Sequence, residues 1–197
     1  QDKVNKTHHF RVRDKKGFLK IIQIFNGFLF TEKKTCQFKI WLEAFNLKYK
    51  ESIYFIIPNI PFTINNSWLS GFTDAEGCFS VSIINRQNGY TQVQVRYILS
   101  QKNELKLFQH ISLLINGKIS YLKSYEGYNL IVNLSNLAPL IKYFAKYPLK
   151  TKKHIKYLTW LKIYYLVTTK KHLTLHGLTR IKLLKNKINK ELSTFKV

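Results

Sequence analysis

The sequence has few acidic residues and almost no cysteine. Ten aspartates and glutamates face 33 lysines and arginines, for a formal net charge of +23. Self-repulsion of that size is most easily tolerated beside a polyanion, which favours nucleic acid, either double-stranded DNA or structured RNA, as the partner. The two cysteines, Cys36 and Cys78, lie far apart and in no ligand-like spacing. The sequence therefore indicates neither a disulfide scaffold nor a zinc site.

Long apolar runs are also absent. The best candidate, residues 157–167, is short and is interrupted by Lys162, whereas a membrane-spanning helix needs ~20 apolar residues. We therefore expect no membrane partner. The chain has no methionine and begins QDKVNK, so we expect it to be processed from a longer product or to be a fragment. Its 45% hydrophobic and 15% aromatic residues are too many for a disordered basic tail and predict a folded core.

An internal repeat emerges when the chain is shifted by 119 residues. Residues 17–46 then align without gaps with residues 136–165, which places Trp41 on Trp160. Two amphipathic helices can share such a pattern by chance, but a Lys-Lys pair seven residues before the tryptophan in both copies favours a true repeat. We expect the front half of the first copy to lie upstream of Gln1. The predicted domains are 1–50, the C-terminal part of a first repeat; 51–66, a linker; and 67–197, a complete second repeat.

The second repeat predicts an α+β domain. It opens with a short helix over residues 68–76, which we expect Gly77 to stop in the left-handed conformation. A β-hairpin follows. Periodicity then predicts a helix over 103–116, a strand pair over 119–125 and 128–132, and helices over about 137–146, 153–168 and 173–190. This order is typical of a sheet with one apolar face under the helices and one polar face outward.

The register of the first hairpin follows from its alternation of apolar and polar residues. A two-residue Asn-Gly turn would place apolar side chains opposite polar ones. A three-residue loop over 87–89, with Gly89 left-handed, instead gathers the polar side chains on one face: Ser80, Ser82, Arg86, Gln92, Gln94 and Arg96. Such a ribbon fits the DNA major groove, where Gln and Arg side chains meet base edges. It is also typical of the solvated face of an antiparallel sheet.

Two acids close the first helix of this repeat. Asp74 and Glu76 lie in the run DAEG, and the small residues Gly71 and Ala75 precede them one turn apart. If a second helix of the same kind packs against these small residues, the acids of the two helices converge and form a site for Mg²⁺, which activates water for phosphodiester hydrolysis. The alternative is that Asp74 caps the helix locally and Glu76 lies on the surface.

Four segments of the sequence resemble one known family. WLSGFTDAEG (residues 68–77) is similar to the signature motif of the LAGLIDADG homing endonucleases, and GCFSVSI after it to the strand that follows that motif. PLKTKK (148–153) and the tail HLTLHGLTRIKLLKNKIN (172–189) resemble segments of members encoded in organellar group I introns. The resemblance implies a saddle of two αββαββα repeats, with motif helices at a pseudo-twofold interface and sheets in the DNA major groove. It also implies a mitochondrial protein.

The resemblance further implies roles for individual residues. In this family the last acid of each motif binds the catalytic metal, which corresponds to Glu76, while Asp74 corresponds to an acid with a structural role at the helix end. A basic residue near the site corresponds to Lys152. The residues expected to bind nucleic acid are Ser80, Ser82, Arg86, Gln92, Gln94, Arg96, Arg11, Arg13, Lys33 and Lys153.

One departure from the family pattern limits these expectations. Double-strand cleavage in the family uses one acid from each of two motifs, and this sequence contains one motif. Three interpretations follow: the chain is part of a larger endonuclease, a second chain supplies the other motif, or the protein binds without cutting. The functional hypotheses are a Mg²⁺-dependent DNA endonuclease and a non-cleaving RNA-binding protein, either an intron maturase or a ribonucleoprotein component. Both would bind in a strongly salt-dependent way.

Overall fold

A computed structural model describes residues 10–58, 63–87 and 89–193. The chain divides into two compact units, Gln1–Pro61 and Phe62–Val197. The predicted assignment of these parts to an incomplete and a complete repeat stays a prediction. None of the described helices is both long enough and apolar enough to cross a bilayer.

The first unit is a pair of helices, α1 (Lys15–Phe25) and α2 (Glu32–Tyr49). The carboxylate of Asp14 begins α1 by accepting a hydrogen bond of 2.7 Å from the backbone N–H of Gly17, as an N-cap acid does. The two helices enclose a small apolar core, whose buried members are Ile22, Phe38, Leu42 and Phe45. After a shift of 119 residues, the residue ranges of α1 and α2 overlap those of two helices of the second unit described below, and the internal repeat itself stays a prediction.

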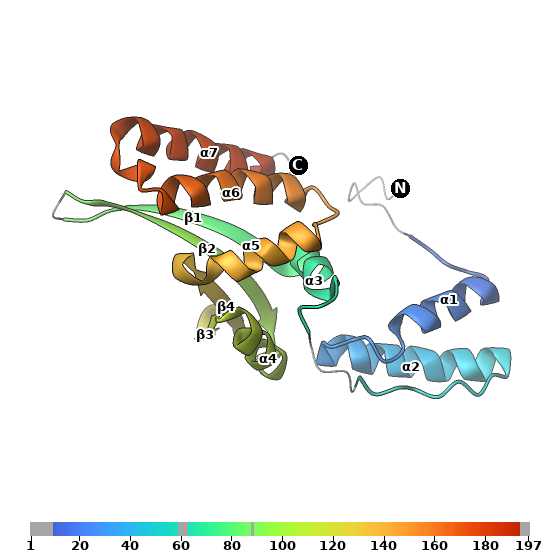
Figure 1. Ribbon diagram of the computed structural model, residues 1–197. Helices are drawn as coiled ribbons and strands as arrows, with labels where there is room; N and C mark the ends of the chain where they lie inside the picture. Colours follow the sequence, from blue (N-terminus) through green and yellow to red (C-terminus); the bar gives the residue numbers. More distant parts are fainter. Residues whose placement is uncertain (1–9, 59–62, 88, 194–197) are drawn as a thin grey trace. The chain divides into compact units, whose positions relative to one another are not determined.

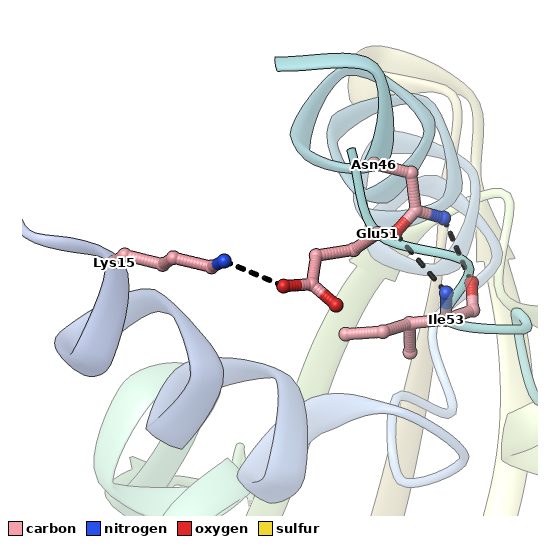
Figure 2. Close-up of polar contacts among 4 residues, drawn as sticks. All are labelled: Lys15, Asn46, Glu51 and Ile53. Atoms are coloured by element: carbon pink, nitrogen blue, oxygen red, sulfur yellow. Dashed lines mark hydrogen bonds and ion pairs between the residues drawn. The ribbon is translucent and has the colours of Figure 1, made fainter. Parts of the chain in front are cut away.

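An extended segment, residues 51–58, runs back along this helix pair. The Asn46 amide donates to the Ile53 carbonyl (2.9 Å) and accepts from the Ile53 N–H (3.2 Å), and Figure 2 shows this pair beside the 2.6 Å ion pair between Lys15 and Glu51. Asn26 makes the same two-way contact further along the segment. Each asparagine therefore presents to the segment the donor and acceptor that a neighbouring strand would offer.

The second unit is an antiparallel sheet with helices on one face, which confirms the predicted α+β class (Figure 1). The strand order is β1-β2-β4-β3. The strands are β1 (Gly77–Asn85), β2 (Thr91–Lys102), β3 (Lys118–Leu122) and β4 (Gly127–Asn133). The helices are α3 (Trp68–Glu76), α4 (Leu105–Ile115), α5 (Leu137–Lys146), α6 (Lys153–Thr168) and α7 (Leu175–Ser193).

The predicted register of the first hairpin is confirmed. Ser80 lies opposite Arg96, and Ser82 lies opposite Gln94. Gly89 has a φ of +77°, the left-handed conformation that the three-residue loop requires. Because side chains alternate between faces along a strand, this register puts the whole polar ribbon on the face of the sheet turned away from the helices, which we call the outer face.

The inner face of the sheet is packed with aromatic side chains. Phe79 on β1 lies with its ring centroid 5.2 Å from that of Trp160 on α6 and 5.8 Å from that of Phe144 on α5. Trp160 is fully buried and its indole N–H donates to the Ser80 carbonyl (3.3 Å). The helix α6 thus packs on β1 and β2, and it anchors the strand that follows the motif helix.

Gly77 does not stop α3 in the left-handed conformation as predicted. Its φ and ψ are −74° and 148°, which is extended backbone, and it is the first residue of β1. A side chain here would lie 2.9 Å from the carbonyl oxygen of Thr73 and would also meet the Thr73 methyl group. Glycine is therefore needed for a close approach, because the strand leaves the helix without an intervening loop.

Two other predicted boundaries were also wrong. The strand expected over 119–125 ends at Leu122, and a 3-10 turn, Lys123–Tyr125, leads to Glu126 at φ +54°. The helix expected from residue 173 begins at Leu175 after a second 3-10 turn, Lys171–Leu173. Both turns continue an apolar or basic pattern without a glycine or proline, so sequence periodicity alone did not mark them.

A buried hydroxyl pair between α3 and β2 provides a test of this fold. The Thr73 and Tyr97 hydroxyls lie 2.6 Å apart and both residues are fully buried. Tyr97→Phe should lower the free energy of unfolding by about 1–3 kcal/mol, because the Thr73 hydroxyl loses its partner. Adding Thr73→Val should recover most of that loss, since no polar group is then left unpaired.

Urea unfolding measures both variants. Tyr121→Phe, at a half-exposed tyrosine of β3, is the control and should change the free energy of unfolding by less than about 0.5 kcal/mol. A double variant that is no more stable than Tyr97→Phe alone would contradict the role assigned to the pair.

Candidate nucleic-acid and metal site

The motif helix α3 is fixed to α5 by tyrosine hydroxyls. The Tyr143 hydroxyl accepts from the Ser70 N–H (3.1 Å) and donates to the Asn66 carbonyl (2.8 Å). The Tyr147 hydroxyl donates to the Asn65 carbonyl (2.5 Å), and the Ser70 hydroxyl donates to the backbone carbonyl of Tyr147. These bonds satisfy the backbone at the start of α3. The sequence analysis did not identify them, although Tyr143 and Tyr147 stand at i, i+4 spacing.

The other side of α3 is open in the second unit. Gly71 is exposed and has no atom of a neighbouring element within 4 Å of the position that a side chain would take. Ala75 and Glu76 are exposed as well. The predicted small-residue face therefore lies on the surface of the second unit, and the carboxylate of Glu76 lies at its end.

Asp74 ties the α5–α6 loop to the end of α3. Its carboxylate accepts hydrogen bonds from the backbone N–H of Lys150 (2.8 Å), the N–H of Thr151 (3.4 Å) and the Thr151 hydroxyl (2.6 Å). Hydrogen bonds to an ionised acceptor are stronger than neutral ones. Asp74 thus has a structural contact of the kind expected for it, and this contact fixes the residues just before α6.

Lys153, the first residue of α6, closes the C-terminal end of α3. Its ammonium group donates to the carbonyls of Thr73 (2.9 Å) and Ala75 (3.3 Å), where a cation also complements the helix dipole. Burial lowers the pKa of Lys153, and the carboxylates of Asp74 and Glu76 oppose this shift. The ammonium group therefore lies at the same helix end as Glu76.

The structure separates the two lysines that the sequence offered for the basic role. Lys152 is exposed and occupies the N-cap position of α6, whereas Lys153 is half-buried and reaches the motif. The neighbourhood of Glu76 therefore contains the side chain of Lys153. The assignment of the catalytic role to Lys152 stays a prediction, and the geometry favours its neighbour.

The outer face of the sheet carries the predicted polar side chains. Arg96 donates to the Ser82 hydroxyl (3.0 Å), and Arg86 donates from Nε to the Gln92 amide oxygen (3.2 Å). Gln94 is half-buried beside them. The Nε of Arg96 is buried and has no hydrogen-bond partner among the described residues.

Cys78 links the outer face to the end of α3. It follows the motif by one residue, and it alternates onto the same face as Ser80. Burial raises the pKa of the Cys78 thiol, while Lys153, Lys156 and Arg96 lie near enough to oppose that shift. The cations of α6 and the arginine of β2 therefore meet at one corner of the sheet. Lys156 was not among the predicted residues.

Three predicted nucleic-acid residues belong to the first unit. Arg11 and Arg13 lie in irregular chain before α1, and Lys33 lies in the first turn of α2. All three are exposed. The structure thus leaves them on the surface of a unit that contributes no strand among its described residues.

The acidic residues of the second unit could supply part of a metal site, but they do not form a complete one by themselves. Among the residues that the structure describes, no three His, Cys, Asp or Glu side chains gather in one place. Asp74 is occupied by the α5–α6 loop, which leaves Glu76 as the acid available at the corner. Mg²⁺ is held through one or two carboxylates together with phosphate oxygens and water. A single exposed carboxylate beside a face suited to a polyanion could therefore be one ligand of such an ion.

Comparison with known proteins follows this geometry. Residues 69–164 match the family described as LAGLIDADG endonuclease. The probable intron-encoded endonuclease 4 of Neurospora crassa is 51% identical over 96% of this chain and 35% of its own length. The solved structure of the LAGLIDADG homing endonuclease I-LtrWI bound to target DNA has a TM-score of 0.59 and 31% identity over 74% of this chain and 51% of that one. The chain belongs to the LAGLIDADG family.

The relatives of this LAGLIDADG chain include an RNA maturase. The intron-encoded RNA maturase bI4 of Saccharomyces cerevisiae is 26% identical over 62% of this chain and 18% of its own length. The relatives named are intron-encoded proteins of fungi. This chain spans 35% of the Neurospora relative. In this LAGLIDADG domain, α3 is the motif helix, and the outer face lies next to its C-terminal end.

The Asp74 contacts predict a graded response to substitution. Asp74→Ala should lower the free energy of unfolding by about 1–3 kcal/mol, because the loop loses a charged acceptor. Asp74→Asn should lower it less, since the amide oxygen still accepts from the loop. Hydrogen exchange at the Lys150 and Thr151 amides should accelerate in the same order, and urea unfolding measures the stability.

Glu43→Ala removes an exposed carboxylate of α2 and serves as the control. It should leave the exchange of those two amides unchanged. Equal protection of these amides in the wild-type protein and Asp74→Ala would show that the carboxylate does not hold the loop.

Proposed function

We propose that this chain supplies one half of a site-specific DNA endonuclease. The observation that supports this most strongly is the corner at Gly77. There burial lowers the pKa of the Lys153 ammonium group, and the exposed carboxylate of Glu76 is near enough to oppose that shift and lies beside the polar outer face. A carboxylate beside cations and a surface for phosphates is the arrangement that phosphodiester hydrolysis requires.

In this proposal the outer face binds the major groove of a DNA duplex. An antiparallel ribbon fits that groove, and arginine and glutamine side chains distinguish bases by donating to and accepting from their edges. Arg96 lies on this face with its guanidinium group bonded to the Ser82 hydroxyl, and the Arg86–Gln92 pair lies towards the hairpin loop. Lys153 and Lys156 would contact the backbone at the corner, where phosphate contacts position the duplex.

Glu76 would hold a share of a Mg²⁺ ion at this corner. The ion supplies a Lewis acid that activates water and stabilises the leaving oxygen of the phosphodiester. Glu76 keeps its carboxylate exposed at the end of a helix that Asp74 and Lys153 have fixed. Lys153 adds positive charge close to the scissile phosphate, where negative charge develops during hydrolysis.

The proposal requires a second acid from another motif helix. The exposed face of α3, at Gly71 and Ala75, is where such a helix would pack, because the absence of bulky side chains lets two helices approach closely. The second helix would come from a longer form of this protein or from another chain. Because the relatives are fungal intron-encoded proteins, we further propose that the protein acts in mitochondria.

The first test is Mg²⁺-dependent cleavage of a duplex that spans the intron-insertion site, by a form of the protein in which the second motif helix is present. Glu76→Gln should slow nicking by more than the roughly 100-fold that loss of an outer-shell partner costs, while the Kd for the duplex changes less than threefold. Arg96→Gln should do the reverse and weaken binding by about 5- to 100-fold, because a base or phosphate contact is lost.

Glu126→Gln is the matched control, since Glu126 is an exposed acid in the turn between β3 and β4, across the sheet from β1. It should alter neither nicking nor binding. If a form that contains both motif helices, either the longer protein or this chain together with the chain that supplies the second motif, binds the duplex but never nicks it, the endonuclease proposal fails. The second candidate, an RNA-binding protein related to the maturases, then takes its place.

A further inference from the structure

Two arginines on the outer face each hold a polar side chain of the neighbouring strand. Arg86 on the loop side of β1 binds Gln92 on β2, and Arg96 on β2 binds Ser82 on β1. In each case the partner is the diagonal neighbour on the same face and not the residue directly opposite, a separation that long side chains span. The two pairs share this geometry and differ in the group that the arginine holds, which is an amide in one and a hydroxyl in the other.

Arg86 fixes the direction in which the Gln92 amide points. The Nε and Nη2 groups of Arg86 both donate to the Gln92 Oε1 atom, at 3.2 and 2.5 Å. Because arginine carries donors only, the amide must turn its oxygen towards the guanidinium group, and the two bonds use both lone pairs of that oxygen. The hydrogen-bonding groups that remain on the two side chains are N–H groups. Together, Arg86 and Gln92 can therefore only donate.

The second pair is not restricted in this way. Arg96 donates one hydrogen bond of 3.0 Å to the Ser82 hydroxyl. A hydroxyl has two lone pairs and one hydrogen, so Ser82 can still both accept and donate. Of the two pairs, only Arg86–Gln92 thus has its hydrogen-bonding character set before a ligand arrives. It also lies open to one, since Arg86 is exposed and Gln92 is half-buried.

A pair that can only donate distinguishes the two purines. A glutamine with a free oxygen prefers adenine, because its oxygen accepts from the N6 amino group while its NH₂ group donates to N7. Guanine instead presents two acceptors in the major groove, N7 and O6. With the Gln92 oxygen occupied, the amino group of adenine would meet only donors, whereas both acceptors of guanine would be satisfied.

We propose that Arg86 and Gln92 act as one unit that reads a guanine, and that Arg86 sets this preference by occupying the Gln92 oxygen. The inference rests on the proposed function, because it requires a duplex on the outer face. It adds the identity of one base and the residue that decides it. Without Arg86, the same glutamine would read the other purine.

The strand geometry places this guanine away from the corner at Gly77. Ile84, which pairs with Gln92, lies seven residues along β1 from Gly77. At about 3.3 Å per residue this separation is about 23 Å. Since base pairs are spaced by about 3.4 Å, we expect the guanine about seven base pairs from the phosphodiester at the corner, towards the hairpin loop.

The test is selection of duplexes from a pool of randomised sequence, in EDTA, by the form of the protein that contains both motif helices. Arg86→Met keeps a long side chain and removes the donors, so the Gln92 oxygen becomes available. Arg86→Lys keeps a donor for that oxygen. Thr91→Val is the control, because it removes the hydrogen bond from the Thr91 hydroxyl to Asn85 (3.2 Å) at the same end of the hairpin, on the opposite face.

The wild-type protein should select guanine at one position by at least about fivefold over adenine, which is the lower end of what one base contact contributes. Arg86→Met should select adenine at that same position, and Arg86→Lys should still select guanine. Thr91→Val should select the wild-type base at every position. If the pair merely stiffened the hairpin, Arg86→Met and Thr91→Val would both bind more weakly and select unchanged bases.

Two results would overturn the inference and leave DNA binding intact. One is a wild-type preference for adenine at the position that Arg86→Met alters, and the other is selection of the wild-type base at every position by Arg86→Met. If no duplex sequence is enriched, the inference falls together with the DNA-binding part of the proposed function. Failure of cleavage alone would change none of these results, because the selection uses no Mg²⁺.

Discussion

The second unit depends on how the C-terminal end of its motif helix is held. Asp74 accepts hydrogen bonds from the α5–α6 loop, and Lys153 returns two bonds to the last carbonyls of the same helix. Because β1 starts at Gly77 with no loop, a shift of this helix end would also move the first strand of the sheet. The acid at position 76, the polar face and α6 are thereby placed as one piece of structure.

Sequence reasoning predicted the first hairpin well, because the alternation of apolar and polar side chains decided between a two-residue and a three-residue loop. A three-residue hairpin loop puts Ser80 and Ser82 on the same face as Gln94 and Arg96, whereas a two-residue loop does not, and the register of the three-residue loop is found. The α+β class and the helices over 137–146 and 153–168 followed from periodicity alone. The boundaries that failed, at Gly77 and at Leu122, depend on close packing and on an unmarked 3-10 turn.

The site was harder to predict because its contacts join distant parts of the chain. Adjacent lysines 152 and 153 are equivalent in sequence, and only the starting point of α6 decides which one reaches α3. The bonds from Asp74 to residues 150 and 151, and those from Tyr143 and Tyr147 to the chain before α3, span more than 70 residues. No local pattern encodes such pairings. The sequence was enough to recognise the two acids of α3 and the basic segment before α6. It was not enough to predict which of their side chains contact one another.

The asparagine contacts in the first unit set the length of the segment that leaves it. Asn46 and Asn26 each bind backbone groups at fixed positions, and between them Ile53 and Phe55 pack against the helix core while Tyr54 is exposed. One extra residue between the two attachment points would reverse that alternation and turn the apolar side chains outward. The number of residues between the two attachment points is therefore fixed. An insertion there would destabilise the unit, even though this stretch belongs to no sheet.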